Sequence, residues 1–272
     1  MKKLITSLLI GVSALSGFAR QGGMTHEWSG MINTGQHMNT SSITSDENGN
    51  IFLGTWNVKG NADLDLAATS NAVNFGTTNG STVISYASDK SFRWAKSFTS
   101  ESRISNVTIG QNGEVIVTGG FQGSLVSDGT TLLTGTAGKW NGFVVKLDKD
   151  GKYLDGIAFN SGNAAWIFGA EVDATSGDIY VTGYSTGTLD LDVKGANTST
   201  ITSTTNDGFT VKYNSSLEYQ WASKNIGSGD IQNRTIAQDA NYIFVGGNHK
   251  TGSLAVSKVG ATTTDFNTEF SV

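Results

Sequence analysis

The 272-residue sequence contains no cysteine and no proline. Without cysteine, the fold has no disulfides, and neither a thiol nucleophile nor a thiolate metal ligand is available. Without proline, the turns must be made by glycine, asparagine and aspartate, and 35 glycines are present. These absences predict a chain with many tight turns that is held together by packing and hydrogen bonds alone.

Positive charge is also scarce and is not clustered. The chain has 18 Lys and Arg residues against 23 Asp and Glu residues, for a formal net charge of −5. The lysines and arginines are scattered and form no basic stripe, whereas proteins that bind nucleic acid concentrate positive charge to neutralise phosphates. The composition therefore argues against nucleic acid as a partner.

A long hydrophobic run occurs only at the N-terminus. Two lysines precede an apolar run from Leu4 to about Leu15, and the small residues Gly17 and Ala19 follow it. This pattern predicts a secretory signal peptide over residues 1–19. The run is shorter than the roughly 20 apolar residues of a membrane-spanning helix and is interrupted by polar residues. We therefore expect residues 20–272 to be exported, either secreted or in the cell envelope, with no membrane insertion after cleavage.

One short strand pattern occurs four times in the sequence. The copies are GNIFLGTW (49–56), GEVIVTGG (113–120), GDIYVTGY (177–184) and ANYIFVGG (240–247). Aligned on Gly54, Gly119, Gly183 and Gly246, they recur at nearly equal intervals along the chain. Self-similarity at a fixed period is the signature of a repeat architecture.

Other strand patterns recur in step with the first. The segments 81–94, 142–154 and 208–221 each read as an alternating strand that enters a polar turn, and Lys146 and Lys212 occupy matching places. The apolar runs VIVTG and IYVTG are nearly continuous, as in strands buried on both faces, and nothing has a helical period. Each unit therefore reads as four strands.

A four-stranded sheet cannot bury both faces alone and needs similar neighbours. Sheets stacked radially around an axis cover one another, which is the β-propeller arrangement, whereas a linear solenoid usually has shorter repeats. We predict an all-β fold of β-propeller type with about four four-stranded blades and a period of about 63–65 residues. The predicted repeats are approximately 26–93, 94–154, 155–220 and 221–272.

These motifs resemble the SBBP-type β-propeller repeats of secreted and surface bacterial proteins. The resemblance is carried by WA at the start of a unit, a strand like GDIYVTGY, an Asp-x-Asp after it (63–65 and 189–192), and DGFTVKY or NGFVVKLDKDG. It covers about residues 26–258 and implies a propeller at or outside the bacterial envelope. Repeat one lacks the GF before its last strand, and repeat two has LVSDG in place of the Asp-x-Asp.

The last repeat departs most from the pattern. The stretch from the glycine to the matching lysine is of similar length in repeats two and three, at 119–146 and 183–212. In the last repeat it is less than half as long, because Lys258 follows Gly246 closely. Residues 265–272 then resemble the turn and opening strand of a fifth unit, with Phe270 in the tryptophan position. Either this tail closes a ring or the ring is incomplete, and we favour the incomplete ring.

The sequence contains no positive signal for catalysis. Its three histidines, His26, His37 and His249, lack partners at metal-binding spacing, and neither a GxSxG motif nor a Walker phosphate loop occurs. We predict no enzymatic activity, no catalytic residues, no metal site and no cofactor.

Paired carboxylates offer a second reading as calcium ligands. The pairs Asp63 with Asp65 and Asp190 with Asp192 share a strand side, and the segments 45–50 and 148–151 place several oxygen ligands near a glycine. Calcium takes six to eight oxygen ligands, and the ligand count here is short. Because Asp, Asn and Gly are also the usual residues of tight turns, we favour a structural role.

Tryptophans are the remaining candidates. Trp94 and Trp221 recur at the repeat period, which indicates packing within the units. Trp56, Trp140 and Trp166 do not recur, and they form either local packing or a platform for a carbohydrate or peptide. Function in such folds is carried by connections, here 57–79, 121–139 and 185–205.

The sequence thus predicts an exported, non-enzymatic binding or scaffold module whose ligand is a carbohydrate or a protein. One alternative is a secreted polysaccharide lyase or hydrolase built on the same scaffold. Another is a purely structural part of a larger surface protein. The binding residues themselves are not specified at this level.

Overall fold

A computed structural model describes residues 38–65, 72–74, 79–195, 198–227, 229–239, 242–250 and 254–259. The predicted signal peptide, His26, His37 and the 265–272 tail lie outside these ranges. The described chain is all-β, as predicted, and contains one short 3-10 turn, Gln111–Gly113. No helix in these ranges is long and apolar enough to cross a membrane.

The strands in the described ranges are β1 (Asn39–Ser45), β2 (Ile51–Val58), β3 (Asn61–Asp63), β4 (Ala72–Asn74), β5 (Gly80–Tyr86), β6 (Phe92–Phe98), β7 (Ser102–Ile109), β8 (Val115–Gln122), β9 (Ser124–Ser127), β10 (Thr130–Thr134), β11 (Trp140–Leu147), β12 (Tyr153–Phe159), β13 (Ala164–Val172), β14 (Ile179–Asp190), β15 (Thr200–Tyr213), β16 (Tyr219–Gly227), β17 (Ile231–Gln238), β18 (Ile243–His249) and β19 (Leu254–Val259).

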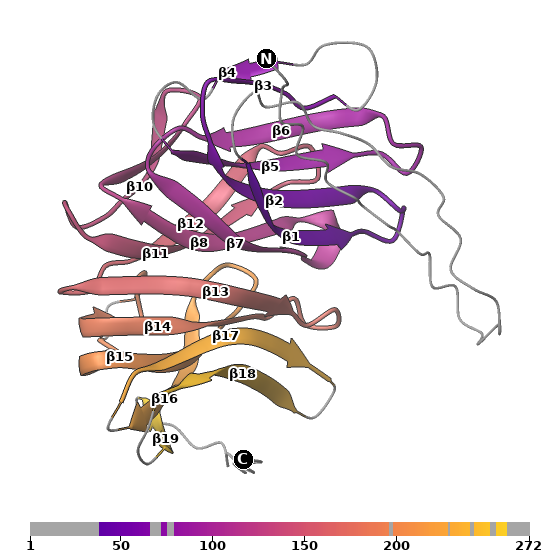
Figure 1. Cartoon of the computed structure of the whole chain (residues 1–272). Helices are drawn as coiled ribbons and strands as arrows, with labels where there is room; N and C mark the ends of the chain where they lie inside the picture. The colour runs from indigo at the N-terminus through magenta and orange to yellow at the C-terminus, as the bar shows by residue number, and fades with distance from the viewer. Residues whose placement is uncertain are drawn as a thin grey trace.

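The largest sheet has eight antiparallel strands and curls like half a barrel (Figure 1). Its order is β12-β11-β8-β7-β2-β5-β6, with β1 paired to β2. One residue pair, Trp56 with Arg103, joins β2 to β7. The sheet therefore consists of two four-stranded meanders, β1-β2-β5-β6 and β7-β8-β11-β12, which are joined by this single ladder pair.

A third meander, β13-β14-β15-β16, follows, and β19 pairs with its last strand. The strands β17 and β18 form a separate pair. Two of the sequence repeats open at Trp94 on β6 and Trp221 on β16. These strands pair with β5 and β15, which precede them in the chain, so the next meander begins one strand after the start of the sequence repeat. The first strand of each unit lies against the unit before it, with β7 on β1, β13 on β7 and β8, and β17 on β13 and β14.

The four repeated strands are β2, β8, β14 and β18, and a β-bulge aligns them. In each unit the first strand contains one unpaired residue. The residue just before it on that strand pairs with a residue of the second strand, which in the four units is Thr55, Gly119, Gly183 and Gly247. These four positions are equally spaced along the sequence. The alignment on Gly54 and Gly246 is therefore wrong by one position, because the bulge and not the first glycine sets the register.

The bulge explains why three of these positions are glycine. A Cβ on Gly119 would lie 2.0 Å from the carbonyl oxygen of Arg103, and one on Gly183 would lie 2.0 Å from that of Trp166. At Gly247 the corresponding oxygen, from Gln232, would be 2.2 Å away. In these three units the first strand thus approaches the second so closely that a side chain has no room there, whereas in the first unit the position holds Thr55.

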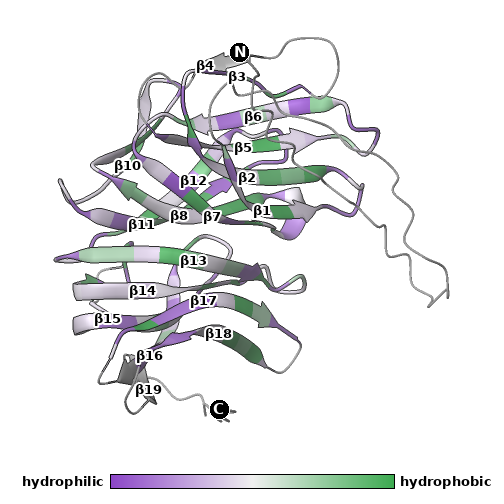
Figure 2. Ribbon diagram, in the orientation of Figure 1, coloured by the Kyte–Doolittle hydropathy of each residue, from purple (hydrophilic) through white to green (hydrophobic). Residues whose placement is uncertain are grey.

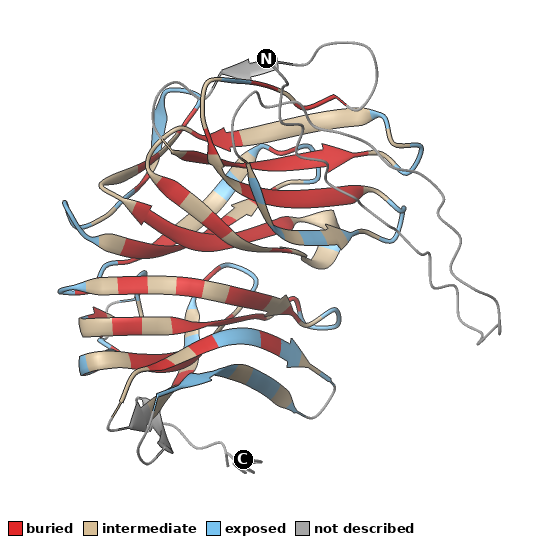
Figure 3. Cartoon of the chain, viewed as in Figure 1, coloured by how far each residue is buried: buried red, intermediate tan, exposed pale blue. Residues whose placement is uncertain are grey.

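The core is formed between neighbouring units. In β11, Val144 packs with the apolar residues of β13, β14 and β15, whereas Phe143 and Val145 pack with those of β7 and β8. Strand β8 is buried from Val115 to Phe121, which confirms the expectation of strands buried on both faces. Figure 2 shows apolar segments on the central strands, and Figure 3 shows that they are buried.

The β17–β18 pair is the exception. Tyr242 is 61% exposed, and Phe244 on β18 is 56% exposed. Figure 3 shows β18 exposed along most of its length, whereas the middle strands of the other units are buried. Within the described ranges, β18 pairs with β17 alone. Its other edge has no strand partner there.

Candidate binding site at the first strands of four units

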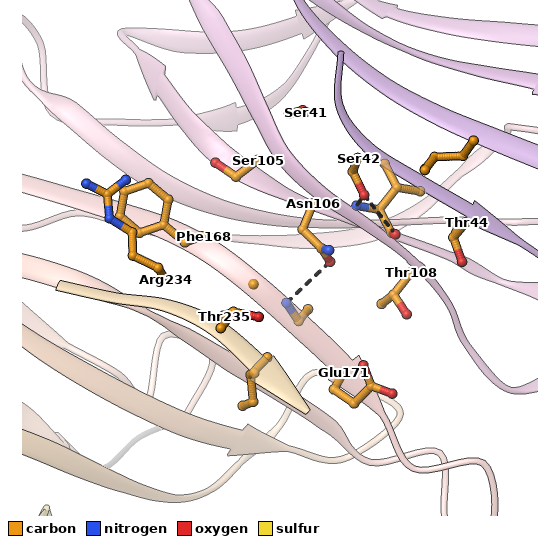
Figure 4. A pocket seen from close by; sticks show the side chains of 15 residues that line it. Ser41, Ser42, Thr44, Ser105, Asn106, Thr108, Phe168, Glu171, Arg234 and Thr235 are labelled. Atoms are coloured by element: carbon orange, nitrogen blue, oxygen red, sulfur yellow. Dashed lines mark hydrogen bonds between the residues drawn. The ribbon is translucent and has the colours of Figure 1, made fainter. Parts of the chain in front are cut away.

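The first strands of all four units line one cavity of about 360 Å³ (Figure 4). We call it the four-strand pocket. Its lining residues are Ser41, Ser42, Ile43 and Thr44 of β1, Ser105, Asn106, Val107 and Thr108 of β7, Phe168, Gly169, Ala170 and Glu171 of β13, and Arg234, Thr235 and Ile236 of β17. Equivalent positions of four units thus meet at one place.

The residues at the bulges all belong to this lining. They are Ser41, Ser105, Phe168 and Arg234, each of which lacks a cross-strand partner in its ladder. A bulge redirects a side chain away from the regular alternation of the strand. The same backbone feature therefore places two serines, a phenylalanine and an arginine in the lining of one pocket.

Hydrogen bonds between units hold the pocket wall together. The Ser42 hydroxyl accepts from the Val107 amide at 3.0 Å, and the Asn106 side-chain oxygen accepts from the Ala170 amide at 3.3 Å (Figure 4). Side chains of one unit thus satisfy backbone groups of the next. The wall is continuous from β1 through β7 to β13.

Opposite charges stand at opposite ends of the pocket. The Arg234 guanidinium lies 4.0 Å from the centre of the Phe168 ring, and Figure 4 shows this pair at one end and Glu171 at the other. Burial raises the pKa of the half-buried Glu171 carboxyl, because removal from water disfavours its charged form. The pocket is thus polar, with a cation on an aromatic ring at one end.

The three tryptophans that do not recur in the sequence meet beside this pocket. They surround Arg103, whose guanidinium carbon lies 4.9, 5.1 and 6.0 Å from the ring centres of Trp56, Trp140 and Trp166. All four side chains are half-buried. We call this group the tryptophan–arginine cluster.

The cluster spans four strands, with Arg103 on β7, and lies next to two predicted connections. Trp56 lies on β2 just before the connection 57–79, and Trp140 is the first residue of β11, just after the connection 121–139. Trp166 lies on β13, and its ring centre is 4.7 Å from that of Trp140. The 185–205 connection, in contrast, is mostly a hairpin extension of β14 and β15.

A hydrogen bond and a stacked ring join the cluster to the pocket. The Trp166 indole N–H donates to the hydroxyl of Ser105 at 2.8 Å, and the Trp166 and Phe168 rings stack at 6.1 Å. Because Ser105 and Phe168 both line the pocket, the aromatic row continues from Trp56 to Arg234. Cluster and pocket thus form one continuous surface of aromatic, cationic and polar groups.

The predicted packing tryptophans lie elsewhere. The Trp94 ring centre is 5.9 Å from that of Phe52 on β2, and the Trp221 ring centre is 6.2 Å from that of Tyr180 on β14. Each therefore packs on the second strand of its own unit. This matches the expectation that the repeating tryptophans stabilise the units.

In each pair of aspartates, the first carboxylate accepts a hydrogen bond from the backbone. The Asp65 amide donates to Asp63 at 3.2 Å, and the Asp192 amide donates to Asp190 at 3.0 Å. These are the side-chain-to-backbone bonds of an Asx turn.

The two glycine-containing segments 45–50 and 148–151 are turns of the same kind. Asp46 accepts from the amide of Asn48, and Asp148 accepts from the amides of Asp150 and Lys152. Across the described ranges, no three His, Asp or Glu side chains are grouped so as to hold a metal ion. His249 is an exposed residue at the end of β18.

Sequence reasoning identified the tryptophans but missed the residues that connect them, namely Arg103, Ser105, Phe168, Glu171 and Arg234. No signal within any single repeat marks these residues, because no single residue type occupies the equivalent positions in all units. Comparison of the chain with models of known protein families and with curated proteins gave no match.

Proposed function

We propose that this protein is an exported, non-enzymatic binding module with a β-propeller architecture, and that it holds a carbohydrate on the tryptophan–arginine cluster. The N-terminal sequence pattern supports export, and the resemblance to SBBP-type repeats supports a bacterial surface setting. The observation that carries the proposal is the convergence of three tryptophans on one arginine beside a polar pocket.

The sheet pairing supports a propeller. Three consecutive four-stranded meanders repeat at equal spacing along the sequence, and each packs its faces against the next. Their first strands converge on a common pocket, as the inner strands of blades do around an axis. The four-strand pocket then corresponds to the central channel.

The chemistry of the cluster supports a carbohydrate ligand. Binding sites are usually concave, with aromatic side chains and a few oriented polar groups. Indole rings offer flat apolar faces to the C–H face of a sugar ring, while serine, asparagine and arginine side chains bind its hydroxyl oxygens. Here the indoles of the cluster adjoin a pocket lined by serine, threonine and asparagine side chains.

The carboxyl groups of the site favour binding over hydrolysis. Most glycoside hydrolases require two carboxyl groups that flank the scissile bond. Among the described residues that line the four-strand pocket, Glu171 alone carries a carboxyl group. A secreted polysaccharide-active enzyme is therefore the less supported alternative.

Glycan-array binding by the full chain tests the proposal. We expect binding to at least one glycan, a loss of about tenfold or more in Trp140→Ala through removal of one stacking face, and unchanged binding in Trp94→Ala, in which a packing tryptophan is removed. Absence of glycan binding would contradict the proposal. Release of shortened oligosaccharides during incubation with a bound polysaccharide would instead establish the enzyme.

A second candidate function is that of a scaffold, and the β17–β18 pair supports it. The exposed rings of Tyr242, just before β18, and Phe244, on β18, lie 6.2 Å apart, and β18 has one unpaired edge in the described chain. Exposed apolar side chains on a free strand edge are a typical surface for pairing with another polypeptide. The second polypeptide would pair with the edge of β18 that has no strand partner in the described ranges.

Light scattering tests this second candidate. We expect the full chain to form a species larger than a monomer, and a double variant with Tyr242→Ser and Phe244→Ser to be monomeric. A wild-type protein that is monomeric at all concentrations would leave the binding module as the better description.

A further inference from the structure

The described arginines make unusual contacts. In the described ranges, every ion pair is made by a lysine. Arg93, Arg103 and Arg234 instead lie over aromatic rings. A planar guanidinium that stacks on an aromatic face keeps its N–H groups free to bind acceptors in its own plane.

Two of these arginines also have hydrogen-bond acceptors. Arg93 donates to the Ser85 hydroxyl at 2.9 Å and to the Lys149 carbonyl at 3.1 Å, and Arg234 donates to the side chain of Gln232. Within the described part of the chain, the Arg103 guanidinium contacts the three indoles and donates to no acceptor. Arg103 therefore has five N–H donors directed at no protein oxygen described here.

This arrangement matters because Arg103 is half-buried. A desolvated guanidinium without an acceptor is unfavourable, whereas a bidentate carboxylate satisfies two donors and the charge together. The aromatic surroundings orient the guanidinium plane and lower the local polarity, which strengthens such a bond. The site is thus preorganised for an anionic group.

No acidic side chain of the described chain competes for Arg103. Glu101, two residues earlier, forms no ion pair with it, and Glu171 lies at the far end of the pocket (Figure 4). At the near end, Arg234 adds a second positive charge over Phe168. The surface from Trp56 to Arg234 therefore carries two cations on an aromatic row.

We infer that the ligand of the tryptophan–arginine cluster is an acidic saccharide, with a uronic acid carboxylate bound by the Arg103 guanidinium and the sugar ring against the indoles. This inference rests on the proposed carbohydrate-binding function and names its ligand class. An acidic peptide would satisfy Arg103 equally well, but three indole faces around one guanidinium suit a sugar ring that carries its own carboxylate.

Calorimetric titration of the full chain tests the inference. The probes are oligomers of galacturonic, mannuronic and glucuronic acid, each beside its carboxyl-reduced neutral form. We expect at least one acid to bind about tenfold or more tightly than its neutral form, since hydrogen bonds between charged groups are the stronger ones. Arg103→Gln should abolish this preference. Arg103→Lys should restore part of it, because lysine keeps the charge but not the fork geometry.

Arg93→Gln is the matched control, because Arg93 also lies over an aromatic ring but already has its acceptors. It should leave both affinities unchanged. Equal binding of acidic and neutral forms would overturn the inference while leaving the carbohydrate-binding function intact, whereas no binding of either form would refute both.

Two further results also count against the inference. Binding of poly-glutamate with the same dependence on Arg103 would assign the site to an acidic peptide. An acid preference that Arg103→Gln leaves unchanged would move the anion site elsewhere. If Arg103→Gln does not fold, the comparison of acidic with neutral forms on the native protein and on Arg103→Lys still decides the matter.

Discussion

The hydroxyl of Tyr213 donates a hydrogen bond to the carbonyl oxygen of Leu191 at 2.7 Å, inside the core of the third meander. Tyr86 makes the same bond to Leu64 at 2.6 Å in the first meander. Both leucines stand between the two aspartates of an Asp-x-Asp segment. The second unit has neither the segment nor the tyrosine and carries Leu147 instead. The Asp-x-Asp motif and the tyrosine therefore form one structural device that fastens the long connection to the sheet.

Tyr213→Phe removes the hydrogen bond to Leu191 but keeps the aromatic ring in the core. We expect the free energy of unfolding to fall by about 1–3 kcal/mol, because the Leu191 carbonyl loses its buried donor. Urea unfolding followed by fluorescence measures the change. Tyr242→Phe, at an exposed ring, is the control and should have no effect; equal stability of the Tyr213 variant and the native protein would show that the bond contributes nothing.

The bulge register leaves no room for a Cβ atom at Gly183. A Cβ there would lie 2.0 Å from the Trp166 carbonyl oxygen, so the two strands would have to separate. We expect Gly183→Ala to lower the free energy of unfolding by about 2–4 kcal/mol. At Gly162 the nearest atom to a Cβ is 3.7 Å away, so Gly162→Ala should be close to neutral. Similar stability of the two variants in thermal unfolding would refute the register.

Buried and exposed ion pairs should differ in their effect. Lys224 and Asp207 lie 2.8 Å apart with side chains only 12% and 7% exposed, whereas the side chains of Lys149 and Asp150 are 67% and 64% exposed. Asp207→Asn leaves a lysine buried without its counter-charge and should cost about 3 kcal/mol. Asp150→Asn should cost less than about 1 kcal/mol. Chemical denaturation at neutral pH compares them, and equal losses would contradict the burial difference.

Burial of the Glu171 carboxyl in the four-strand pocket should reduce the stability of the folded protein at neutral pH. Burial raises the pKa of this carboxyl in the folded state above its unfolded value, so folding is disfavoured as the pH rises through the folded pKa. Glu171→Gln should therefore be more stable than the native protein at pH 7 and equally stable well below pH 4. Thermal unfolding across this range measures the difference, and a gain that persists at low pH would assign the effect to something other than ionisation.

Much of the architecture follows from local pattern. Strand positions and the Asx turns at Asp46 and Asp148 follow from alternation, apolar runs and turn residues, all of which act over a few neighbouring residues. The period was also readable, because each unit needs the same packing residues. The all-β prediction is confirmed for these reasons.

The binding surface depended on contacts between distant residues. Trp56, Trp140 and Trp166 belong to three strands, and only the packing of one unit on the next gathers them around Arg103. The register came from β-bulges, which move Ser105 and Phe168 out of the regular alternation, and no single residue type occupies the bulge position in all four units. Pairing of β19 with β16 rather than β18 was likewise decided by long-range hydrogen bonding. A strand's local pattern specifies that it is a strand, but which neighbour it meets is decided only when the whole chain packs.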